Sequence, residues 1–133
     1  PGYHPEESAT KDLSGQLRQQ LNDDLRRAMK EITPKELEAM KKEGTAFQLI
    51  DVREPYELEL CNIGGQSIPM GDIVDRIAEV RKDVPVVIHC RSGARSGAVI
   101  NALASRYGFD NLINLKGGIL AYGRDVDPTL KCE

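Results

Sequence analysis

Short apolar runs alternate with amphipathic stretches along most of this 133-residue chain. The β-branched run from Val86 to Ile88 is typical of a buried strand, and the apolar spacing after it predicts a helix over 94–107 that stops at Gly108. Thr33, Pro34 and Glu36 resemble a capping box that opens an earlier helix. The expected strands lie at Ile32, at 47–52, just before and at Ile68, at 86–89 and at 112–115, and helical segments are expected from Pro34 to Gly44, at 55–60, 73–80, 94–107 and from Ile119. This alternation predicts an α/β fold, with a central, mostly parallel sheet flanked by helices on both faces.

Residues 1–30 do not share this pattern. Leu or Met recurs at every fourth position from Leu13 to Met29, which would form a narrow apolar stripe on a helix. We therefore expect residues 1–30 to be either a linker or an amphipathic helical extension, and residues 31–133 to be one domain. Because the chain does not begin with Met, either a Met preceded Pro1 or the domain was cut from a longer protein.

Composition limits the function classes further. The net charge of −3 argues against a nucleic-acid partner, and the sequence has neither a span of about 20 apolar residues for a membrane helix nor a secretory signal. The spacing of Cys61, Cys90 and Cys132 suggests neither a disulfide framework nor a zinc site. We therefore expect a cytoplasmic protein with no membrane contact, no metal and no cofactor.

The richest chemistry follows the predicted strand at 86–89. Cys90 stands where that strand ends and a helix is about to begin, so unpaired backbone N–H groups and partial positive charge favour a thiolate or a bound anion there. Arg91 and Arg95 add positive charge, and Gly93 permits a tight turn. A cysteine in this position could simply be buried and inert, but two arginines and two serines beside it are poor core material.

The spacing between cysteine and arginine separates two enzyme classes. Only four residues lie between Cys90 and Arg95, whereas enzymes like the protein tyrosine phosphatases have five. The tighter loop resembles the active loop of the rhodanese family. Three further segments resemble motifs of that family in the family's order, namely 47–54, 63–69 and 116–122, with Tyr122 in place of a Trp.

The resemblance implies a single rhodanese-like domain and a sulfurtransferase in which Cys90 carries sulfur as a persulfide. The donor would be anionic, such as thiosulfate, or the persulfide of a cysteine desulfurase. The substrate-binding residues would be Arg91, Ser92, Gly93, Ala94, Arg95 and Ser96. Asp51, at the end of another predicted strand, should lie nearby and either hold the loop, through Arg95 or loop amides, or cap a helix. Arg53 is a candidate for a substrate contact or for a structural ion pair.

Segments 58–63 and 125–130 resemble one branch of the family, the C-terminal rhodanese domain of adenylyltransferase-sulfurtransferases. That resemblance implies a sulfur-carrier protein as acceptor. Cys61 and Asn62 replace the usual Gly-His and Gly64 replaces a proline, so Cys61 is either a second redox-active thiol or a half-buried residue near a strand. The alternative functions are a rhodanese-fold phosphatase or arsenate-reductase-like enzyme, and a non-catalytic binding module.

Overall fold

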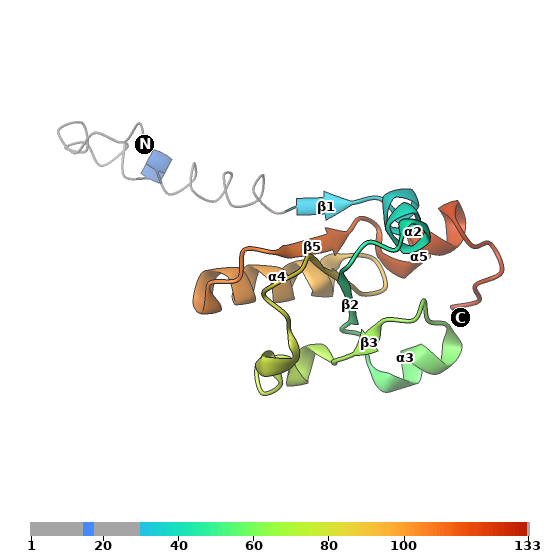
Figure 1. Ribbon diagram of the computed structural model, residues 1–133. Helices are drawn as coiled ribbons and strands as arrows, with labels where there is room; N and C mark the ends of the chain where they lie inside the picture. The colour runs from blue at the N-terminus through green and yellow to red at the C-terminus, as the bar shows by residue number, and fades with distance from the viewer. Residues whose placement is uncertain (1–14, 18–29, 133) are drawn as a thin grey trace.

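The computed structural model describes residues 15–17 and 30–132, and within them five strands form one sheet (Figure 1). The strands lie in the order β1-β5-β4-β2-β3, and every pairing is parallel. They are β1 (Lys30–Ile32), β2 (Gln48–Asp51), β3 (Gln66–Ser67), β4 (Val86–His89) and β5 (Leu112–Leu115). The predicted α/β class with a mostly parallel sheet is therefore confirmed. The strand before the cysteine, β4, lies at the centre of the sheet, and its residues are therefore buried on both faces.

The helical segments are α2 (Pro34–Glu43), α3 (Pro55–Leu60), η2 (Met70–Asp72), η3 (Ile77–Glu79), α4 (Ala94–Tyr107) and α5 (Gly118–Asp125). Helix α2 begins as its sequence predicts. The backbone N–H of Glu36 donates to Thr33 Oγ1 at 3.1 Å, and the N–H of Thr33 donates to Glu36 Oε1 at 2.8 Å. The helix ends at Gly44, which has the left-handed φ of 69° that favours glycine.

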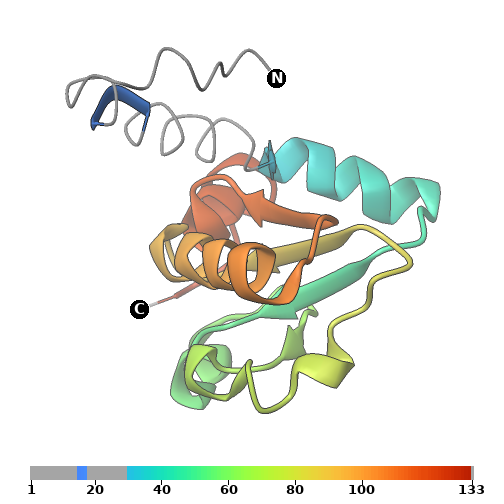
Figure 2. The same ribbon diagram turned by 90° about the vertical axis from the view of Figure 1, so that its left-hand side faces the viewer.

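The period-two alternation of side chains divides the core into two clusters, one on each face of the sheet. Val86 and Ile88 pack with α4, while Val87 packs with Leu37 of α2 and Tyr122 of α5. Helices α2 and α5 lie side by side on their face (Figure 1), and Figure 2 shows α4 lying along the sheet beside β4 and β5. Each face of the central strand is thus covered by helices.

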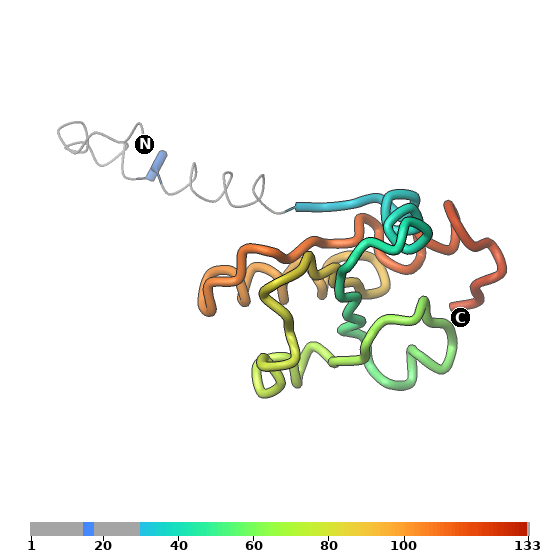
Figure 3. Tube along the Cα trace, viewed as in Figure 1, coloured from blue at the N-terminus to red at the C-terminus, as the bar shows by residue number. Residues whose placement is uncertain are grey.

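The connection between β3 and β4 differs from the expected helix over 73–80. It forms two short 3₁₀ segments, η2 and η3, and Figure 3 shows it as an irregular stretch at the β3 end of the molecule. Ile73 and Val80 still reach the core, so their spacing reports burial correctly. The hydrogen bonds there span three residues, as Val80 N–H to Ile77 O does at 3.1 Å. The β-branched side chains in this segment favour a continuous α-helix only weakly.

The predicted stripe from Leu13 to Met29 lies outside the described residues except for a helical fragment at 15–17. The division near residue 31 therefore stays a prediction. Among the described residues, no helix is long and apolar enough to cross a membrane.

Candidate active site

Cys90 lies at the carboxyl end of the central strand, between His89 at the end of β4 and Ala94 at the start of α4. Gly93 adopts a φ of 110° as the residue before the helix, which makes the turn tight. Arg95 and Ser96 consequently belong to the first turn of α4. The order of strand, cysteine, turn and helix agrees with the sequence-based expectation.

The Cys90 sulfur faces hydrogen-bond donors from this turn. Its Sγ lies 3.1 Å from the backbone N of Gly93, 3.4 Å from the backbone N of Ser96 and 3.4 Å from Ser96 Oγ. Burial raises the pKa of the Cys90 thiol, but hydrogen bonds from the Ser96 hydroxyl and from the amides of Ser96, Gly93 and Ser92 outweigh it and hold that pKa below its usual value. The loop is therefore arranged to stabilise a negatively charged sulfur, although Cys90 is only 1% exposed.

The loop carbonyls point the other way, toward the start of α5. The N–H of Ile119 donates to Cys90 O at 2.9 Å, and the N–H of Leu120 donates to Arg91 O at 3.2 Å. Gly118 makes this approach close enough, because it has a φ of 65° and a Cβ there would overlap the Arg91 carbonyl. The sequence motif at 116–122 thus holds the back of the active loop, a role that its residues alone did not reveal.

Arg95 pairs with Glu57 of α3. Its two terminal nitrogens donate to the two Glu57 carboxylate oxygens at 2.7 and 2.9 Å, a bidentate geometry. Hydrogen bonding to Arg95 lowers the pKa of Glu57 to about 2. The expectation that Asp51 holds the loop through Arg95 is wrong, since the carboxylate that pairs with Arg95 is that of Glu57. Glu57 could not be identified from the sequence because it lies between motifs, and its spacing from Arg95 carries no signal.

Asp51 instead forms a buried ion pair with Arg53. The Arg53 Nη2 donates to Asp51 Oδ2 and to the carbonyl of Cys61, each at 2.8 Å, and its Nη1 donates to the carbonyl of Glu57 at 3.3 Å. His89 Nε2 lies 3.6 Å from Asp51 Oδ2, and burial lowers the pKa of His89, which favours the neutral ring. Of the two candidate roles for Arg53, the structure shows the ion pair. Arg53 is 2% exposed, and its contacts hold the middle and the C-terminal end of α3.

The structure corrects the expectation that the cysteines form no disulfide. Cys61 and Cys132, 71 residues apart, are joined by a disulfide, and Cys90 is the free cysteine among residues 15–17 and 30–132. Cys61 is therefore not a free second thiol here. Sequence spacing could not predict the pair because only the fold brings the C-terminal tail back to the end of α3, as Figure 1 shows.

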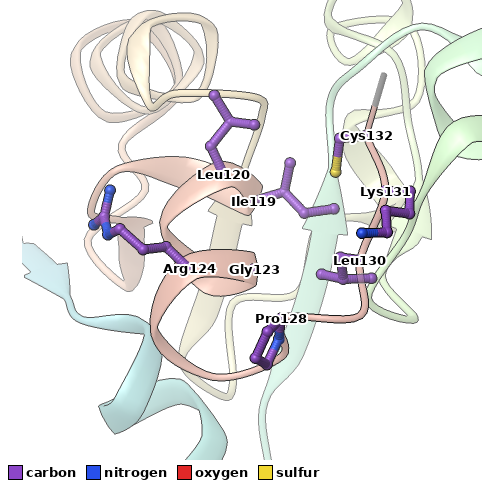
Figure 4. A pocket seen from close by; sticks show the side chains of 8 residues that line it. All are labelled: Ile119, Leu120, Gly123, Arg124, Pro128, Leu130, Lys131 and Cys132. Carbon is purple, nitrogen blue, oxygen red and sulfur yellow. The ribbon is translucent and has the colours of Figure 1, made fainter.

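A hollow of about 550 Å³ opens between α5 and the disulfide-bound tail. Figure 4 shows Leu120 and Arg124 on the helix side and Leu130 and Cys132 on the tail side. The active loop contributes none of the residues that line this hollow. No cluster of three His, Cys, Asp or Glu side chains that could hold a metal ion occurs in the described part of the chain.

Comparison with known proteins places this geometry in a family. A sequence model described as a rhodanese-like domain matches residues 33–125. The chain is 40% identical over 86 residues to a protein of Allochromatium vinosum named sulfurtransferase, covering 64% of this chain and 79% of that protein. It is 34% identical over 102 residues to the probable adenylyltransferase/sulfurtransferase MoeZ of Mycobacterium tuberculosis, covering 74% of this chain but only 26% of MoeZ.

Among solved structures, a rhodanese-like domain protein from Staphylococcus aureus superposes with a TM-score of 0.67. It is 33% identical, and the match covers 79% of this chain and 99% of that one. The fold, the order of motifs and these relatives therefore all indicate a rhodanese-like domain.

Proposed function

Because the chain belongs to the rhodanese-like domain family, we propose that it transfers sulfane sulfur through a persulfide on Cys90. The observation that carries the proposal is the contact of the Cys90 sulfur with backbone N–H groups of Gly93 and Ser96, at 3.1 and 3.4 Å. These donors favour the thiolate, which is the nucleophilic form of cysteine. Sulfurtransferase names among the relatives support the same reaction class.

In the first step, the Cys90 thiolate attacks the outer sulfur of the donor. With thiosulfate, a lone pair on Sγ forms the new S–S bond, and the bond between the outer sulfur and the sulfonate sulfur breaks. Its electron pair leaves with sulfite, and the outer sulfur stays on Cys90 as an anionic persulfide. Arg91 and Arg95 would attract the anionic donor, and the loop amides would stabilise the persulfide.

In the second step, a nucleophilic acceptor attacks the outer sulfur of the persulfide. The new bond joins that sulfur to the acceptor, and the bond to Sγ breaks with its electron pair returning to Cys90. The departing group is the same thiolate that the donors from Gly93 and Ser96 stabilise, so one set of donors serves both steps. With cyanide as acceptor, the product is thiocyanate.

The experiment is mass spectrometry of the protein after incubation with thiosulfate. One added sulfur, about 32 Da, should appear on the peptide that contains Cys90, and cyanide should remove it. The Cys90→Ser variant should gain no sulfur. If the intact chain gains none from thiosulfate or from a cysteine-desulfurase persulfide, although Cys90 reacts with iodoacetamide, the domain is a non-catalytic module.

A phosphatase is the second candidate, and the loop length argues against it. The six residues from Cys90 to Arg95 leave less room for the three oxygens of a phosphoryl group than a longer loop does. We expect no hydrolysis of p-nitrophenyl phosphate. Robust hydrolysis with no persulfide on Cys90 would favour the phosphatase.

For the cellular partners, we propose a cysteine-desulfurase persulfide as donor and a sulfur-carrier protein as acceptor. Support comes from the relatives named adenylyltransferase/sulfurtransferase, of which this chain spans about a quarter. Single-turnover transfer of ³⁵S from the Cys90 persulfide to a purified carrier protein tests the acceptor. Transfer to cyanide but to no carrier would restrict the proposal to small acceptors.

We propose the cytoplasm as the compartment on the composition given above. Thiol reductants there would oppose the bond between Cys61 and Cys132, since disulfides are rare in reducing compartments. Acid-quenched cells followed by alkylation should then yield three modified cysteines in the protein. A single modified cysteine would indicate an oxidising compartment.

A further inference from the structure

Asn114, on β5, connects two parts of the active loop and is assigned no role by the motifs above. Its side chain is 5% exposed. Its Oδ1 lies 2.6 Å from Ser96 Oγ, and its Nδ2 donates to the carbonyl of Gly93 at 3.2 Å. Both contacted residues also lie against the Cys90 sulfur, so two hydrogen bonds in series, through Ser96, link Asn114 to the reacting atom.

The orientation of the Asn114 amide follows from its partners. The Gly93 carbonyl can only accept a hydrogen bond, so the amide nitrogen must face it. The amide oxygen then faces Ser96, and the separation of 2.6 Å suits an O–H donor better than an N–H donor. The Ser96 hydroxyl therefore donates to Asn114.

The Ser96 hydroxyl has one hydrogen but three acceptors within reach. Asn114 Oδ1 is nearest at 2.6 Å, followed by the Gly93 carbonyl at 3.3 Å and the Cys90 sulfur at 3.4 Å. While the hydrogen points at Asn114, Ser96 Oγ turns a lone pair toward the sulfur and can accept the S–H of a neutral thiol. To stabilise a thiolate, the hydrogen must leave Asn114 and turn to the sulfur.

We propose that Asn114 is a positioning residue that competes with the Cys90 sulfur for the single hydroxyl hydrogen of Ser96. Asn114 holds this hydrogen while Cys90 carries its own proton, and releases it when the sulfur becomes an anion. Asn114 thereby restrains ionisation of the thiol, while the amides of Gly93 and Ser96 promote it. The kinetic part of this inference rests on the proposed function, but the thiol titration does not.

Asn114→Asp adds a negative charge near Cys90, whereas Asn114→Ala and Ser96→Ala leave the charged groups around it unchanged. On α4 and the loop these groups are Arg95 and Arg91, and Glu57 of α3 pairs with Arg95 at 2.7 Å. On the opposite face of the sheet, Asp51 and Arg53 pair with each other beside the buried His89. The difference that Asn114→Ala makes with and without Ser96 therefore reports on the hydrogen-bond path from Asn114 through Ser96.

The test is the pH profile of iodoacetamide alkylation at Cys90, read by mass spectrometry of the Cys90 peptide. In Asn114→Ala, the competing acceptor is gone and the midpoint should fall by about one pH unit, since the Ser96 hydroxyl can then donate to the thiolate at no loss of another hydrogen bond. In Asn114→Asp, a stronger acceptor and a negative charge should raise the midpoint by about one unit or more. In a Ser96→Ala background, Asn114→Ala should no longer lower it.

The sign of the Asn114→Ala effect separates this inference from simple support of the loop. Asn114→Ala and Asn114→Asp each remove the amide donor to the Gly93 carbonyl. If Asn114 only supported the loop, the midpoint would therefore rise in both variants. A midpoint that rises or stays unchanged in Asn114→Ala overturns the proposal. So does a fall that persists at full size in the Ser96→Ala background.

A kinetic measurement adds the connection to sulfur transfer. One pH unit below the wild-type midpoint, Asn114→Ala should transfer sulfur from thiosulfate about twofold faster, because the gain in thiolate is partly offset by its lower nucleophilicity. A slower transfer despite a lower midpoint overturns the kinetic part. If neither the wild-type protein nor any variant transfers sulfur while the alkylation midpoints move as expected, the proposed function fails and the role of Asn114 stands.

Discussion

Cys90 and Cys61 are both buried, at 1% and 7% exposure, but their surroundings differ in kind. Cys90 faces two backbone N–H groups at the start of α4, and its sulfur is free. Cys61 ends α3, is bonded to Cys132 of the tail, and has its carbonyl held by Arg53. Burial alone therefore does not decide whether a cysteine is reactive. The groups that the fold directs at the sulfur decide it.

The two ion pairs that accompany these cysteines also differ. Near Cys90, Arg95 keeps 34% of its side chain exposed while it pairs with Glu57, so it remains accessible from solvent. Near Cys61, Arg53 is enclosed and its guanidinium is divided between Asp51 and the carbonyls of α3. One region is arranged to meet an incoming anion, and the other is arranged to hold α3 in place.

The largest expected effect separates the two cysteines by function. Cys90→Ser should lower the rate of sulfur transfer from thiosulfate to cyanide by at least about a thousandfold, because a hydroxyl is a far weaker nucleophile at neutral pH. Thermal unfolding should change little. The matched control is the double variant Cys61→Ser with Cys132→Ser, which should retain transfer at a temperature where it is folded. Turnover by Cys90→Ser would remove Cys90 from the mechanism.

Reduction of the disulfide should affect stability and leave the chemistry in place. Closing a chain segment of this length stabilises a fold by up to about 4 kcal/mol through the entropy of the unfolded chain. Urea unfolding of the Cys61→Ser, Cys132→Ser variant should show most of this loss. A variant as stable as the oxidised protein would mean that the disulfide does not stabilise the fold.

Gly118→Ala should damage the active loop from behind. The new Cβ would overlap the Arg91 carbonyl and would occupy a left-handed conformation, so the loop amides should shift away from the sulfur. We expect kcat/KM for thiosulfate to fall roughly tenfold to a hundredfold, since small misplacements of this kind are costly. Gly123→Ala is the matched control on the same helix, because its Cβ would meet Leu130 at an ordinary 3.6 Å. Equal kinetics in the two variants would contradict this role.

Glu57→Gln should have the smallest effect and should depend on pH. Pairing with Arg95 lowers the pKa of Glu57 to about 2, below its usual value of 4.5, so the pair stabilises the fold above pH 4.5 and loses that contribution as the pH falls toward 2. The variant should be about 1–2 kcal/mol less stable at pH 7, and the difference should shrink toward pH 2. Glu59→Gln, exposed on the same helix, is the control and should show neither change. A difference that is constant with pH would contradict the ion pair as its source.

Periodicity determined the fold class and most of the elements, because alternation of side chains along a strand and along a helix is a local property. Cys90 could be placed at the end of β4 and before α4 for the same reason, and the glycine in the turn agrees with the φ that Gly93 adopts. The segment 73–80 shows the limit of this reasoning. Its spacing reported which side chains are buried, but the backbone that buries them is 3₁₀ rather than α.

The partners across the fold came only from the tertiary structure. Glu57 meets Arg95 across 38 residues, Asn114 meets Ser96 across 18, and Cys61 meets Cys132 across 71. Sequence alone could identify the thiol, the cationic loop and the family resemblance, since these lie in contiguous segments. It could not choose the carboxylate for Arg95, or find the acceptor for the Ser96 hydrogen, because packing of separate elements brings these groups together and leaves no local pattern.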